Sequence, residues 1–114
     1  MTNQIEKEFF ETNGVEKIRL YNSAGLFYLG YPPITPEIIL KLEEIITKWI
    51  KSTWNTPLGG TFLILGINLY QIWNGCRTCL YDSYADNRKD ALLKLCTKLA
   101  PEIKEEVQKL FKGE

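Results

Sequence analysis

The dipeptide Asn74-Gly75 separates two runs of residues that favour β-strands, residues 61–73 and 76–82. Both central residues of a type I′ turn need positive φ angles, which asparagine and glycine adopt more readily than other residues. The sequence therefore predicts a β-hairpin that turns at Asn74-Gly75. Within the first run, Gly66 marks either a β-bulge or the junction between two strands.

A two-residue turn fixes the register of this hairpin. On one side of the ribbon we then expect three cross-strand pairs: Ile72 with Arg77, Tyr70 with Cys79, and Asn68 with Tyr81. Tyrosine and arginine beside apolar residues are typical of the residues that dominate binding energy in protein interfaces. We therefore predict a binding surface composed of Tyr70, Ile72, Arg77 and Tyr81, with Trp54, in a polar loop, as a second anchor. The same composition would also suit a face half covered by the acidic N-terminal helix.

The region before the hairpin contains the clearest helical pattern. Thr35 is a suitable N-cap, and Pro36 fits the first helical position. Apolar residues then recur at the i, i+3, i+4, i+7 spacing of one buried stripe, which predicts a helix over residues 36–52.

Shorter patterns predict the other elements. They are a helix over about residues 3–12 that ends at Asn13-Gly14, strands at residues 15–21 and 26–31 around a turn at residues 22–25, a helix capped by Asp86 or Asn87, and a last helix from Pro101.

Together these elements predict a single α+β domain over residues 1–114, a length that suits one domain. We expect an antiparallel sheet of about four strands, packed against the helix of residues 36–52 and the C-terminal helix pair. Four aromatic residues gather in the first strand pair: Tyr21, Phe27, Tyr28 and Tyr31. In a chain this small we expect most of them in the core.

Charge and composition exclude several classes of protein. Lys+Arg and Asp+Glu both number 14, so the formal net charge is zero. Neutralising many phosphates requires surplus cations, so we do not expect a nucleic-acid partner. The first residues lack the basic and apolar regions of a targeting signal, and no apolar run approaches the ~20 residues of a membrane span. Three cysteines suit a reducing compartment, so we expect a cytoplasmic protein with no membrane partner.

The most suggestive chemical motif is Cys76-Arg77-Thr78-Cys79, with a third thiol at Cys96. A structural zinc site needs four ligands, and the chain has neither a second Cys pair of this spacing nor a histidine. A redox pair needs its first cysteine at a helix N-terminus, whereas residues three apart in a strand point to opposite faces. We therefore favour ordinary thiols and a buried apolar role for Cys96. A zinc-stabilised module through Cys76, Cys79 and Cys96 is the alternative.

The lack of histidine also removes the commonest general acid/base and the usual partner of a Ser or Cys nucleophile. The carboxylates of Glu43-Glu44 lie on the polar face of a predicted helix, and the glycines match no phosphate-binding loop. We predict no catalytic residues, no metal and no cofactor, and hence a chain that is not an enzyme. A small-ligand binder or a simple metal-independent enzyme is the alternative.

The layout over residues 35–100 resembles a known group. The order of elements is a helix, a strand-rich segment, an Asn-Gly hairpin and then a helix that opens with Ala85-Asp86-Asn87-Arg88-Lys89-Asp90-Ala91-Leu92-Leu93. This order is similar to that of the small α/β/α "ABA sandwich" proteins of tailed bacteriophages. The extra N-terminal segment and the fourth helix depart from that group. Its members have no assigned catalytic residues, so the resemblance transfers no site residue. It implies a mobile-element origin and an accessory role.

The leading functional hypothesis is a small non-catalytic protein-binding module, such as a phage or mobile-element accessory factor that inhibits a host protein. Its partner would be a protein whose identity the sequence does not specify. An exposed aromatic sheet face would also suit a homodimer.

Overall fold

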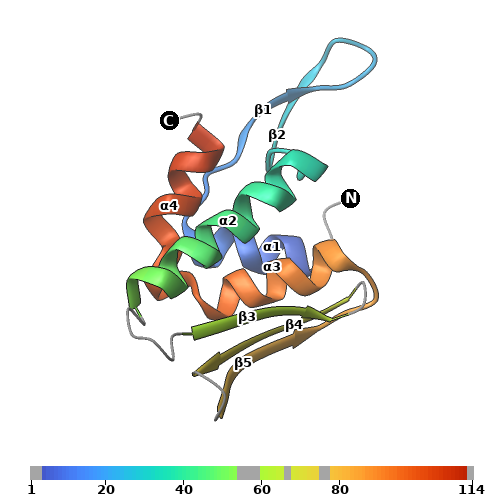
Figure 1. The fold of residues 1–114 in the computed structure, drawn as a ribbon. Helices are drawn as coiled ribbons and strands as arrows, with labels where there is room; N and C mark the ends of the chain where they lie inside the picture. The colour runs from blue at the N-terminus through green and yellow to red at the C-terminus, as the bar shows by residue number, and fades with distance from the viewer. Residues whose placement is uncertain (1–3, 54–59, 66–67, 75–77, 113–114) are drawn as a thin grey trace.

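The computed structural model describes residues 4–53, 60–65, 68–74 and 78–112. Along these ranges the elements are, in order, α1 (Gln4–Asn13), β1 (Ile18–Tyr21), β2 (Phe27–Gly30), α2 (Pro36–Thr53), β3 (Gly60–Leu65), β4 (Leu69–Asn74), β5 (Thr78–Tyr84), α3 (Arg88–Lys98) and α4 (Ala100–Lys112) (Figure 1). The predicted α+β class is confirmed.

The strands divide between two antiparallel sheets. β3, β4 and β5 form a three-stranded sheet with β4 at its centre, whereas β1 and β2 form a separate hairpin. The single sheet of about four strands that the sequence suggested is therefore not formed. β1 and β2 are four residues long and carry apolar residues on both faces, so they lack the alternation that directs one face of a sheet onto helices.

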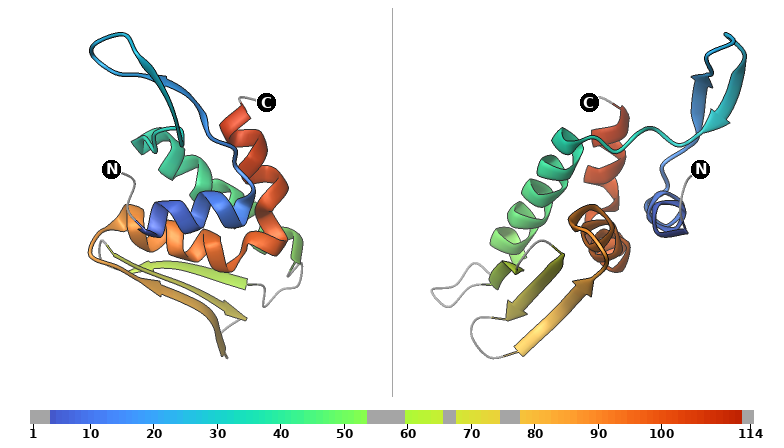
Figure 2. Two further views of the ribbon diagram at one scale, coloured as in Figure 1. Left: turned by 180° about the vertical axis from the view of Figure 1, so that it is seen from behind. Right: turned by 90° about the vertical axis from the view of Figure 1, so that its right-hand side faces the viewer.

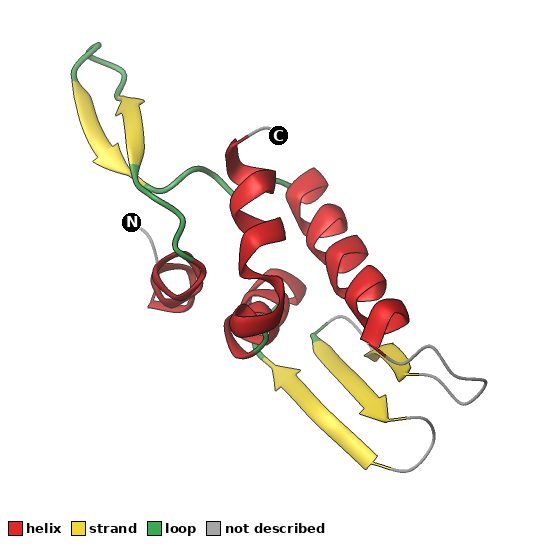
Figure 3. Cartoon of the chain, turned by 90° about the vertical axis from the view of Figure 1, so that its left-hand side faces the viewer, coloured by secondary structure: helices red, strands yellow, loops and turns green. Residues whose placement is uncertain are grey.

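The four helices of the described ranges lie on one side of the three-stranded sheet (Figures 1 and 3). α2 contacts β3, and α3 contacts β4 and β5. In the described ranges, α1 and α4 pack against other helices and not against the sheet. α3 is central because it contacts all three other helices, and its side chains are buried on more than one face: Ala91, Leu92, Leu93, Leu95 and Cys96.

Local sequence signals explain the helix ends. The Thr35 hydroxyl accepts a hydrogen bond from the Ile38 N–H (3.2 Å) at the start of α2, and Asn87 Oδ1 accepts one from the Asp90 N–H (2.8 Å) at the start of α3. α1 ends before Gly14, whose φ of 70° favours glycine. No helix among the described residues is both long and apolar enough to cross a lipid bilayer.

The β4–β5 hairpin forms as predicted, but its register differs from the prediction. Asn74 pairs with Thr78, which leaves three residues between them instead of the two of a type I′ turn. Tyr70 pairs with Ser83 and Ile72 with Tyr81, and the register shifts between Ile72 and Trp73. The longer connection and the bulge between Ile72 and Trp73 together set the register. β3 ends at Leu65 and β4 begins at Leu69, which agrees with the second of the two alternatives, a junction between strands. Gly66 itself lies outside the described residues.

Candidate protein-interaction site

The structure places three of the predicted binding residues, Tyr70, Ile72 and Tyr81, on the covered face of the sheet. Tyr70 and Ile72 are fully buried, because α2 and α3 cover this face. Tyr81 is half-buried, and its ring meets the Trp49 ring edge to face at a centroid distance of 6.3 Å. Arg77 and Trp54 lie outside the described residues. The exposed surface expected from Tyr70 and Ile72 is therefore absent from the described sheet.

Tyr70 has a structural role instead. Its hydroxyl donates a hydrogen bond to Glu43 Oε1 (2.9 Å) and accepts one from Arg88 Nε (3.1 Å). Arg88 also forms an ion pair with Glu43. Burial raises the pKa of Tyr70 to about 12, and the neighbouring Glu43 carboxylate contributes to this rise. The network joins β4 to α2 and α3, so it stabilises the contact between the sheet and the helices.

Most of the exposed large apolar side chains among the described residues lie on the other hairpin, which β1 and β2 form. Large side chains at six positions between residues 18 and 29 are 43–67% exposed: Ile18, Tyr21, Leu26, Phe27, Tyr28 and Leu29. Neither strand contacts any other helix or strand of the described ranges. Figure 2 shows the hairpin projecting away from the helices. The expectation that Tyr21, Phe27 and Tyr28 belong to the core is wrong, because no other described element covers them.

One face of the hairpin points away from the rest of the molecule. The pairs Arg19–Leu29 and Tyr21–Phe27 place four side chains on this face, which we name the outer face: Arg19, Tyr21, Phe27 and Leu29. The Arg19 guanidinium carbon lies 4.7 Å from the centre of the Phe27 ring, a cation–π geometry. The outer face thus combines two aromatic rings, a leucine and one cation, and all four residues are exposed.

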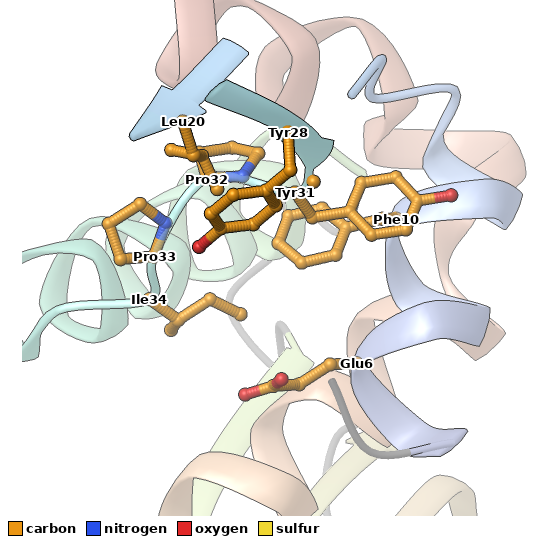
Figure 4. Close-up of a pocket in the computed structure, with 9 residues that line it drawn as sticks. Glu6, Phe10, Leu20, Tyr28, Tyr31, Pro32, Pro33 and Ile34 are labelled. Carbon is orange, nitrogen blue, oxygen red and sulfur yellow. The ribbon is translucent and has the colours of Figure 1, made fainter. Parts of the chain in front are cut away.

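The opposite face of the hairpin borders a hollow of about 260 Å³ between the hairpin and α1. Leu20 and Tyr28 line it from the hairpin, and Figure 4 shows the rings of Tyr28, Tyr31 and Phe10 grouped away from the Glu6 carboxylate. Phe10 stacks on Tyr31 at 4.6 Å. Glu6 accepts a hydrogen bond from Lys89 (2.8 Å), so its charge is neutralised within the fold. The stacking of Phe10 on Tyr31 holds the segment that directly follows β2 beside α1.

The tip of the hairpin is polar and ordered by its own hydrogen bonds. Asn22 Oδ1 accepts hydrogen bonds from the N–H groups of Ala24 (2.9 Å) and Leu26 (3.1 Å), and Gly25 has a φ of 80°. The turn predicted at residues 22–25 and the strands flanking it are confirmed. These hydrogen bonds fix the backbone of the turn that joins the two strands of the outer face.

The thiols that the structure describes contribute to packing. Cys96 is fully buried on α3, and burial raises the pKa of its thiol. Cys79 is half-buried, and its sulfur lies 3.4 Å from the carbonyl oxygen of Tyr81. Cys76 lies outside the described residues. Among the residues with described positions, no group of three or more Cys, Asp or Glu side chains is placed to hold a metal ion.

Comparison of this chain with protein-family models, with curated proteins and with solved structures gives no match. The candidate site is therefore defined by geometry alone. The sequence pattern singled out Tyr70 and Ile72, which the structure buries, and did not single out the exposed residues of the β1–β2 hairpin. One signal did point to the hairpin of residues 18–30: residues 20–34 contain no charged side chain, although they include four aromatic residues.

Proposed function

We propose that this chain is a non-catalytic protein-binding module, and that its partner docks on the outer face of the β1–β2 hairpin. The observation that carries the proposal is the concentration of exposed apolar side chains on one hairpin that its own chain leaves uncovered. Contiguous exposed apolar surface on a small protein is typical of an interaction site.

The chemistry of the outer face supports a protein partner. Tyr21 and Phe27 supply rigid, largely apolar area, and Arg19 supplies a charge-assisted hydrogen-bond donor beside them. Tyrosine and arginine are enriched among the residues that dominate binding energy. The complementary surface would be an apolar pocket with a carboxylate or a carbonyl group at its rim. An accessory factor that inhibits a host protein would act in this way, by occupying a surface that the host protein uses.

The proposal is tested by comparing three versions of the chain as immobilised bait: wild type, Phe27→Ser and Leu40→Ser. Leu40 lies on α2 and is exposed to a similar extent as Phe27, so Leu40→Ser is a matched loss of surface apolar area. Proteins that the wild type and Leu40→Ser retain, and that Phe27→Ser loses, are identified by mass spectrometry. The identified protein is then purified and titrated by calorimetry.

We expect Phe27→Ser to weaken the purified complex by about tenfold or more, because loss of a central aromatic contact costs on the order of 2 kcal/mol. Leu40→Ser should leave the affinity unchanged. Thermal melting checks that both variants fold. A partner that binds wild type and Phe27→Ser equally would place the interaction elsewhere and contradict the proposal.

A further inference from the structure

Apart from its short length of four residues, the free edge of β2 lacks the features that usually keep a strand from pairing with another chain. Natural edge strands carry charged residues, prolines or bulges, or are covered by another element. β2 pairs with β1 without a register shift, and the run of residues 20–34 is uncharged. Within the described ranges, β1 is the single helix or strand that contacts β2. The opposite side of β2 is therefore open to another strand.

The free edge of β1 differs because it carries cations. Arg19 lies within β1 and Lys17 precedes it. Antiparallel pairing of two β1 strands would bring these like charges close together across the contact, which is unfavourable. Pairing of two β2 strands brings no charges together. Charge therefore disfavours self-pairing through β1 and permits it through β2.

The alternation of hydrogen-bonded and non-hydrogen-bonded pairs in the hairpin shows which backbone groups of β2 are not bonded to β1. The Asn22 N–H donates to the Leu26 carbonyl (2.9 Å), so residues 22 and 26 form a hydrogen-bonded pair. Hydrogen-bonded and non-hydrogen-bonded pairs alternate along an antiparallel ribbon. The backbone groups of Phe27 and Leu29 therefore point away from β1, toward the free edge.

We propose that β2 pairs antiparallel with β2 of a second copy of this chain, about a two-fold axis at Tyr28. Phe27 of each copy then pairs with Leu29 of the other, and the two Tyr28 residues lie opposite each other. In this register the free backbone groups of Phe27 and Leu29 form hydrogen bonds with the β2 strand of the partner copy. The resulting four-stranded sheet stabilises a ribbon that, with two strands, is only marginally stable. Figure 2 shows the hairpin clear of the helices, which leaves room for a second copy.

The dimer is expected to be weak. Pairing along a four-residue strand buries less than the roughly 800 Å² per partner of a standard interface, so monomer and dimer should both be populated at micromolar concentrations. The pairing uses the edge of the hairpin and leaves the outer face open. This inference therefore does not depend on the partner docking proposed above, and the dimer would carry two outer faces side by side.

The first test measures the mass of the full chain by analytical ultracentrifugation from about 5 µM to about 500 µM, a range that covers weak association. The mass should rise from one chain toward two. Leu29→Lys places a charge at the β2 edge and should abolish this rise. Tyr21→Lys places the same charge on the same outer face but on β1, and should dimerise like the wild type.

Three outcomes would overturn the proposal. The first is a wild-type chain that stays monomeric at every concentration, including one that binds only another protein or lipid vesicles. The second is a Leu29→Lys variant that dimerises normally, and the third is loss of the dimer in Tyr21→Lys as well as in Leu29→Lys. The last result would indicate association through the outer face. Partner docking and self-pairing are separable, because Tyr21→Lys should lose the docked partner and keep the dimer.

A second test fixes the register and does not depend on Leu29→Lys folding. Opposite residues of a non-hydrogen-bonded pair have Cα atoms about 4.5 Å apart, which suits a disulfide. Tyr28→Cys should therefore form a covalent dimer under mild oxidation on a non-reducing gel. The wild type, with its own thiols, and Tyr21→Cys should not. A Tyr28→Cys sample that is dimeric in solution but gives no covalent dimer would overturn the register.

Discussion

The hydroxyl of Tyr70 on β4 donates a 2.9 Å hydrogen bond to Glu43 Oε1 on α2. Arg88 at the start of α3 donates to both groups, so one polar cluster joins the sheet to two helices. Tyr70 is fully buried, whereas Arg88 is partly exposed. The cluster therefore lies where the interface between the helices and the sheet meets solvent.

Removing the Tyr70 hydroxyl tests this cluster. Tyr70→Phe keeps the ring and its packing against Phe62 but removes one donor and one acceptor. We expect the free energy of unfolding to fall by about 1 kcal/mol, the usual net value of a buried hydrogen bond. Urea denaturation followed by circular dichroism measures the change. Tyr84→Phe, at an exposed tyrosine of β5, is the control and should leave stability unchanged.

The same residue predicts a loss of stability in alkaline solution. Burial raises the pKa of Tyr70 from 10.0 to about 12, so the folded state holds this proton more tightly than the unfolded state. The resulting stabilisation is present below pH 10 and is lost as the pH rises through the interval from 10 to about 12, by about 3 kcal/mol in total. The stability advantage of wild type over Tyr70→Phe should therefore shrink between pH 9 and pH 11. An advantage that is constant across this range would contradict the assignment.

Cys96 should be unreactive in the folded protein. Its side chain is fully buried on α3, and burial raises the pKa of the thiol, so little thiolate is accessible to a reagent. We expect alkylation of Cys96 to proceed at the rate of global unfolding. Iodoacetamide labelling followed by peptide mapping measures this rate. Fast labelling of Cys96 in native buffer would show that α3 opens locally.

The two hairpins should differ in amide hydrogen exchange. β1 and β2 contact no other described helix or strand, whereas α3 contacts all three other helices and two strands. At low concentration we expect protection in β1 and β2 to be roughly a hundredfold lower than in α3, because the hairpin opens without global unfolding. Exchange measured by mass spectrometry tests this difference. Equal protection in both regions would mean that the hairpin unfolds only with the core.

Much of the secondary structure follows from local chemistry. α2 begins at Pro36 after its Thr35 cap, as the sequence predicts, and α3 begins after Asn87. The glycine-containing turn at residues 22–25 is also where the pattern indicates it. These features depend on residues within one or two turns of each other, so the sequence suffices to locate them.

The candidate site could not be located in this way. The sequence suggested that Tyr70 and Ile72 form a binding face and that Tyr21 and Phe27 belong to the core. The structure buries Tyr70 and Ile72 and exposes Tyr21 and Phe27. Both hairpins combine aromatic and aliphatic residues, so composition does not distinguish a strand that meets helices from a strand that does not. The helices α2 and α3 make the difference, because they cover the sheet that contains the β4–β5 hairpin and do not contact the β1–β2 hairpin.

The sequence by itself determined the α+β class, the helix starts and the existence of both hairpins, because each rests on short-range preferences of the backbone and on hydrophobic periodicity. Only the tertiary structure decided the separation of β1 and β2 from the other strands, the register of β4 and β5, and the exposure of the outer face. These depend on which surfaces the chain buries against segments far away in sequence, and burial of apolar area is the largest favourable contribution to folding. Asn74 still ends β4 beside its hairpin connection, but the packing of Tyr70 and Ile72 beneath the helices determines what that hairpin presents to solvent.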